Sequence, residues 1–221
     1  MKKNLIFLLA ALAVFMLAAG IVLSACAKKS EVVIEELEEK PSAAQPASKE
    51  FKTFDIYTDK RSPNNHYIPA GWMGDYSDIK LNDSWMENPH SGTTCIRVEY
   101  TMNRSQGAGW IGVYWQNPAN NWGSKRAGFD LTGATKLTFW ARGDKGGEII
   151  SEFKMGGITG EFSDSASAGI GPAVITQEWK KFEIDLKGQD LSHVIGGFCC
   201  SASADDNTNG LIFYLDDIRY E

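Results

Sequence analysis

Short segments of alternating apolar and polar residues fill the chain from Phe51 to its C-terminus, and glycine-rich turns separate them. No amphipathic helix of useful length interrupts this series. A period of two residues is typical of half-buried β-strands, and many short strands are typical of sandwiches. The sequence therefore predicts one all-β domain at 51–221, an antiparallel β-sandwich of jelly-roll type. Its clearest strands are expected at 94–101, 109–116, 136–142, 148–155, 179–186 and 211–220.

The alternation also assigns side chains to the two faces of each strand. In three strands one face is apolar and is predicted to lie in the core: Leu137, Phe139 and Ala141; Ile149, Phe153 and Met155; and Ile111, Val113 and Trp115. The opposite faces carry Thr138, Trp140 and Arg142; Glu152 and Lys154; and Trp110, Tyr114 and Gln116. If the three strands are neighbours in one sheet, these opposite faces form a platform of flat rings beside hydrogen-bonding groups.

The N-terminus has the layout of a bacterial secretory signal, with Lys2 and Lys3 before an apolar run at 5–23. The run leads into the sequence LSAC, which resembles a lipobox, and we expect its cysteine, Cys26, to carry the lipid. A plain signal anchor is the alternative, because the run approaches the ~20 apolar residues that span a bilayer. Ala27 is not the aspartate that retains enteric lipoproteins at the inner membrane, which favours the outer membrane.

Residues 27–50 are first acidic and then rich in proline, alanine and serine, a composition that cannot build a core. We expect a disordered tether that lets a periplasmic or extracellular domain reach away from the lipid surface. The formal net charge of −6 argues against nucleic acid as a partner, because phosphate backbones attract basic proteins.

Three segments together resemble the strand series of galactose-binding-like jelly-roll carbohydrate-binding modules: FDLTGATKLTFWARG at 129–143, WKKFEIDL at 179–186 and IFYLDDIRY at 212–220. The resemblance extends over most of residues 51–221. It implies a sandwich that binds poly- or oligosaccharides on a concave sheet face or at loop tips. It also implies a structural calcium ion near the first and last strands.

Sugars present apolar C–H faces and a rim of hydroxyls, so their sites combine aromatic planes with planar donors and acceptors. The stretch 110–122 is the densest such mixture, and we predict ligand contacts for Trp110, Tyr114, Gln116, Asn121 and Trp122. Trp72 and Trp85 are expected on loops, where such a ring either contacts ligand or, as we favour, plugs the end of the sandwich. Trp140 and Arg142 would extend the platform, unless a loop covers that face.

The resemblance places the calcium ion at Asp216 or Asp217, with Asp55 or Asp59 from the first strand. Clustered carboxylates are the ligands that calcium prefers. The alternative is that paired aspartates mark an exposed strand edge or turn.

Cys95, Cys199 and Cys200 are an odd number of cysteines for an exported domain. Either Cys95 bonds one of the pair or all three are buried thiols. The three histidines lie in no catalytic motif, and the sequence EFSD at 161–164 does not continue into the carboxylate spacing of jelly-roll glucanases.

These patterns lead to non-catalytic binding of a poly- or oligosaccharide at the cell envelope as the preferred function. The alternative is a structural or protein-interaction lipoprotein that docks an envelope partner, since exposed tryptophans serve both roles. A glycosidase or polysaccharide lyase with carboxylates from distant strands is the third alternative. An open groove with several rings would favour a sugar, whereas covered tryptophans beside a flat apolar patch would favour protein docking.

Overall fold

The computed structural model describes residues 50–221, so the predicted signal, Cys26 and nearly all of the predicted tether lie outside the described residues. The described residues belong to one compact unit, Ala47–Glu221, and its hydrophobic core draws only on them. No helix in this part of the chain is long and apolar enough to cross a membrane.

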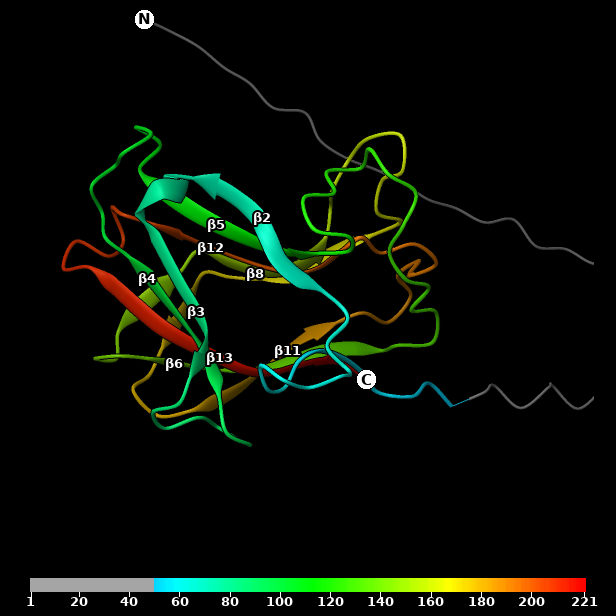
Figure 1. Ribbon diagram of the computed structural model, residues 1–221, viewed down its shortest axis with the longest axis horizontal. Helices are drawn as coiled ribbons and strands as arrows, with labels where there is room; N and C mark the ends of the chain where they lie inside the picture. The colour runs from blue at the N-terminus through cyan, green and yellow to red at the C-terminus, as the bar shows by residue number, and fades with distance from the viewer. Residues whose placement is uncertain (1–49) are drawn as a thin grey trace, which may run out of the picture. The chain divides into compact units, whose positions relative to one another are not determined.

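Two large antiparallel sheets form most of the domain, which confirms the predicted all-β sandwich (Figure 1). The six-stranded sheet has the order β11 (Lys180–Asp185), β6 (Lys136–Gly143), β13 (Leu211–Tyr220), β4 (Cys95–Tyr100) and β3 (Ile79–Trp85), with β1 (Phe54–Tyr57) paired to β13. The five-stranded sheet has the order β2 (Ile68–Gly74), β5 (Trp110–Gln116), β12 (Gly196–Ser203), β8 (Glu152–Gly156) and β9 (Ser167–Ile170). A two-stranded sheet pairs β10 (Ala173–Ile175) with β7 (Glu148–Ile150), and a 3-10 turn, η1, covers Tyr76–Asp78.

The core lies between the two large sheets, where the apolar faces of their strands meet. Phe139 from β6 packs against Phe153 from β8 and Phe198 from β12, with ring centroids 4.7 and 5.1 Å away. All the predicted core residues of 109–116 and 136–142 are buried, as are Phe153 and Met155. The faces of these strands are therefore as the alternation predicts.

The predicted strand at 148–155 is wrong in one respect, because it breaks at Ser151 into β7 and β8. The break shifts the alternation by one residue. As a result Ile150, and not Ile149, is the fully buried isoleucine. β8 stays in the five-stranded sheet, whereas β7 pairs with β10.

Candidate functional site

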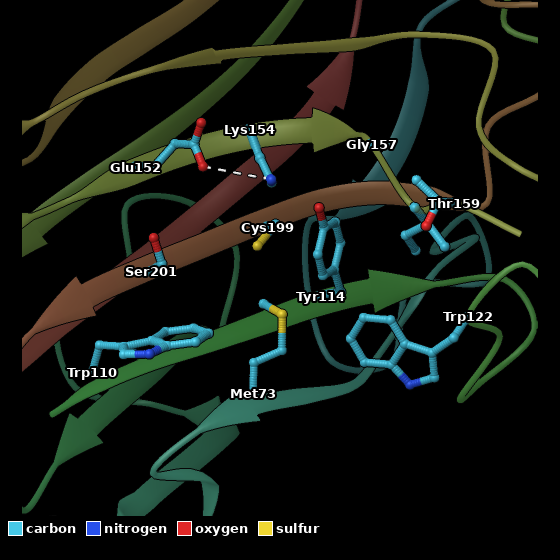
Figure 2. A pocket seen from close by; sticks show the side chains of 11 residues that line it. Met73, Trp110, Tyr114, Trp122, Glu152, Lys154, Gly157, Thr159, Cys199 and Ser201 are labelled. Carbon is cyan, nitrogen blue, oxygen red and sulfur yellow. Dashed lines mark ion pairs between the residues drawn. The ribbon is translucent and has the colours of Figure 1, made fainter. Parts of the chain in front are cut away.

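An open groove of about 490 Å³ lies on the outer face of the five-stranded sheet (Figure 2). The register of β5, β12 and β8 determines which residues form the floor of the groove. Tyr114 on β5 is opposite Cys199 on β12, and Cys199 is opposite Lys154 on β8. One step along, Gly112 is opposite Ser201, which is opposite Glu152. Because side chains alternate across a strand, these residues share the outer face, and Val113, Cys200 and Phe153 between them are buried in the core.

Three aromatic side chains follow β5 along the groove. Trp110 and Trp122 are 41% and 43% exposed, and Figure 2 shows them on either side of Met73 and Tyr114. The Tyr114 ring meets the Trp122 ring edge to face, with centroids 5.9 Å apart. Its hydroxyl donates a hydrogen bond to the Gly156 carbonyl at 2.9 Å, and burial raises the pKa of this phenol. The Tyr114 ring is thus a fixed, uncharged part of the floor.

Gly112 lets the Trp110 ring and Met73 lie low on the sheet. A Cβ atom at this position would stand 2.6 Å from Met73 Cε and 3.3 Å from Trp110 Cζ3. Any larger residue would push these two side chains outward. The glycine therefore sets the depth of the groove between Trp110 and Tyr114.

At the Trp122 end of the groove, the wall is the loop that carries Gly157, Ile158 and Thr159. The side chain of Asp164 holds this loop in place. The Asp164 carboxylate accepts hydrogen bonds from the backbone N–H groups of Ile158, Ile195 and Gly196, at 2.8, 2.6 and 3.1 Å. Burial nevertheless raises the pKa of Asp164. This single side chain ties the wall to the start of β12.

The Trp122 loop packs against the same wall. The Phe162 N–H donates to the Gly123 carbonyl at 2.9 Å. Gly123 has a φ of +82°, and a Cβ there would lie 2.1 Å from the Thr159 carbonyl oxygen. A glycine is required at this close approach, which places the Trp122 ring at the end of the groove.

Polar groups lie along the β8 and β12 side of the groove. Lys154 Nζ is 3.6 Å from the Glu152 carboxylate and 5.6 Å from the centre of the Tyr114 ring. Ser201 adds a hydroxyl beside them. The site therefore combines aromatic planes with hydrogen-bonding groups, as recognition of a hydroxyl-rich ligand requires.

Gln116 and Asn121 do not reach this groove, because both are fully buried. Gln116 Nε2 donates to the Asn121 carbonyl at 3.0 Å, and Asn121 accepts from the Lys125 N–H at 3.1 Å. These amides fold the loop that carries Trp122. They contribute to the groove by positioning that ring.

Trp72 lies on β2 and Trp85 at the end of β3, so the prediction that both are on loops is wrong. Trp72 is paired with Val113 and therefore shares the core-side face of the edge strand. It is half exposed there and does not line the groove.

Trp140 and Arg142 belong to β6 in the opposite sheet, so the assumption that the three predicted strands are neighbours is wrong for this strand. β6 pairs with β11 and β13, whereas β5 and β8 flank β12. The His90 ring stacks on Trp140 with centroids 3.7 Å apart, and Arg142 is buried over the Tyr214 ring.

Six residues of the groove lay outside the sequence prediction: Met73, Gly157, Ile158, Thr159, Cys199 and Ser201. None belongs to an aromatic or amide-rich stretch. The pairing of β2 and β12 with β5 brings Met73, Cys199 and Ser201 to the groove, and the loop after β8 brings the other three. Cys95, Cys199 and Cys200 are buried free thiols, which agrees with the second of the two alternatives for the cysteines.

The four aspartates predicted for calcium do not fit a calcium ion. Asp216 accepts from the N–H groups of His90, Ser91 and Asp217, and Asp59 Oδ1 accepts from Thr93 and Thr94. Asp217 bonds His90 and Arg219, and Arg219 also lies 3.6 Å from Asp55. These carboxylates already face N–H donors and cations. Among residues 50–221, no group of three or more His, Cys, Asp or Glu side chains could hold a metal ion.

We expect the buried Asp216 carboxyl to make the stability of the domain depend on pH. Burial raises the pKa of this carboxyl from 3.8 to about 7. A raised carboxyl pKa means that the folded state holds the proton longer than the unfolded state. Its contribution to stability is therefore present below pH 3.8 and is lost as the pH rises towards 7, by at most about 1.4 kcal/mol per pH unit.

We expect the Asp216→Asn variant to lack this loss. Urea unfolding of both proteins across that range should give a difference in unfolding free energy that moves in favour of the variant as the pH rises. A difference that is constant with pH would contradict a raised pKa at Asp216.

Comparison with solved structures finds a similar fold in carbohydrate-binding modules. Two crystal structures of family 30 carbohydrate-binding modules superpose with TM-scores of 0.51 and 0.52, each at 16% sequence identity. They cover 76% and 77% of this chain, and 87% and 98% of their own. A family 30 module of a cellulosomal cellulase from Clostridium thermocellum gives a TM-score of 0.47 at 16% identity, over 77% of this chain and 97% of its own. No protein-family model matches the chain, and no curated protein matches it.

Proposed function

We propose that this protein binds a poly- or oligosaccharide in the groove of the five-stranded sheet, without changing it chemically. One observation carries the proposal: Trp110 and Trp122 remain exposed at opposite ends of a groove whose floor is Tyr114. Aromatic rings pack against the C–H faces of sugar rings, and the polar groups on β8 and β12 would bond their hydroxyls. An open groove with several rings favours a sugar over a flat protein partner.

The chemistry of the lining supports binding without catalysis. Hydrolysis of a glycosidic bond generally uses two carboxyl groups that flank it. Glu152 is the one carboxylate among the groove-lining residues that the structure describes, and it pairs with Lys154. A glycosidase site would need a second carboxyl group, which these lining residues do not provide.

Affinity electrophoresis tests the proposal. A fragment that begins at Ala47 contains the whole core and is run in gels cast with soluble glucans, mannans, xylans or pectins. We expect at least one polymer to slow its migration relative to a polymer-free gel. If none does, the sugar hypothesis fails and the protein-docking alternative takes its place, with a pull-down of envelope proteins as the next experiment.

The proposal includes a lipid anchor on Cys26 that displays the domain on the cell envelope, with the outer membrane favoured. It rests on the LSAC sequence and on the tether composition. Intact-mass spectrometry of the membrane-extracted protein distinguishes the alternatives. A lipid-modified chain that begins at Cys26 supports the anchor, whereas an unprocessed chain that begins at Met1 identifies a signal anchor.

A further inference from the structure

Two charged side chains line the groove, and they neutralise each other. Glu152 and Lys154 lie two residues apart on β8, point to the same face and approach within 3.6 Å. The other lining residues of the described chain carry no formal charge. The groove is therefore polar but close to electrically neutral.

Lys154 occupies the more central position of the two. Its side chain is 25% exposed, compared with 48% for Glu152, and its ammonium group lies over the Tyr114 ring (Figure 2). A ligand that contacts Tyr114 and Trp122 would pass beside this ammonium. Without Glu152, Lys154 would be an unpaired cation at the point where a ligand binds.

The Glu152 carboxylate beside this ammonium disfavours the binding of acidic glycans. A ligand carboxylate drawn to Lys154 would lie near the Glu152 carboxylate, and like charges at such separations repel. The ligand would also have to displace the ion pair that already satisfies the ammonium. The net charge of −6 for the whole chain adds a weaker repulsion. An uncharged glycan meets neither obstacle and can bond both groups through its hydroxyls.

We propose that Glu152 is a specificity-determining residue: it neutralises Lys154, and the groove therefore selects uncharged glycans over polyuronates. This inference rests on the proposed function, because it concerns the ligand of the same groove. It is a property of the Glu152–Lys154 pair and requires no further site.

The test compares Glu152→Gln with the native protein and with a matched control, Glu183→Gln. Glu183 lies on β11, in the opposite sheet, and its side chain has a similar exposure, 56%. Its carboxylate is 3.9 Å from the Lys136 ammonium. Both variants raise the net charge by one and keep the side-chain shape. Affinities for polygalacturonate and for the uncharged polymer that slows the native protein most are measured by electrophoresis at low and high salt. The unfolding midpoint of each variant verifies its fold.

We expect the native protein to bind the uncharged polymer with little dependence on salt and to bind polygalacturonate at least tenfold more weakly. Glu152→Gln should gain about tenfold in affinity for polygalacturonate at low salt, a gain that high salt removes, while Glu183→Gln changes less than about twofold.

Equal native affinity for the two polymers, or the same gain in both variants, would overturn the role of Glu152 and leave sugar binding intact. A native protein that binds neither polymer would refute the proposed function, and this inference with it.

Discussion

Replacing Trp110 or Trp122 by alanine is expected to weaken glycan binding about 30-fold in each case. An aromatic ring whose exposed face is covered by a ligand contributes on the order of 2 kcal/mol to the binding free energy. This energy corresponds to a change in dissociation constant of about 30-fold. Both rings are about 40% exposed in the free domain, so neither contributes its full area to the core. Isothermal titration calorimetry with oligosaccharides of the retarding polymer measures the change directly.

Trp72→Ala is the matched control for these two variants. Trp72 is 40% exposed and lies on the edge strand of the same sheet, but it shares the core-side face with Val113. The same chemical change at the same exposure should therefore leave affinity within about twofold. A loss at Trp72 that equals the losses at Trp110 and Trp122 would contradict the placement of the ligand in the groove.

Removing the Asp164 carboxylate is expected to damage stability and binding together. In Asp164→Ala, the N–H groups of Ile158, Ile195 and Gly196 lose their common acceptor in a partly buried setting. Leaving such donors unpaired costs about 2–4 kcal/mol of unfolding free energy in total. Because the released loop forms the wall behind Trp122, glycan affinity should also fall.

Urea unfolding and calorimetry on the same preparations check both effects, with Asp130→Ala as the control. Asp130 is exposed and accepts one backbone N–H, from Thr132. Its loss should change stability far less and leave affinity unchanged. If Asp164→Ala behaves like Asp130→Ala, Asp164 does not hold the wall of the groove.

The faces of individual strands could be predicted from sequence because side-chain alternation is a local property. Phe139 and Trp140 are adjacent in the chain, and they lie in the core and on the outer face of β6, as the alternation requires. The same rule indicates Trp110 and Tyr114 as outward-facing. It gives no information about which sheet a strand joins.

Sheet membership depends on pairing between distant segments, and this is where the prediction of one platform failed. Trp140 and Trp110 both point outward, but from opposite sheets. Met73 and Ser201 reach the groove through the pairing of β2 and β12 with β5, which no local pattern encodes. Gln116 points outward as expected, but the 117–125 loop closes over it, so its amide serves the loop and is not free for a ligand.

The most direct test of the groove uses the indole N–H signals of the seven tryptophans in a ¹⁵N-labelled domain. The domain is titrated with gluco-, manno- and xylo-oligosaccharides while two-dimensional NMR spectra are recorded. The proposed site predicts that the signals of Trp110 and Trp122 shift with a common dissociation constant, whereas those of Trp140 and Trp179 in the opposite half of the sandwich stay in place. Shifts confined to Trp140 or Trp179, or no shift with any sugar, would contradict it.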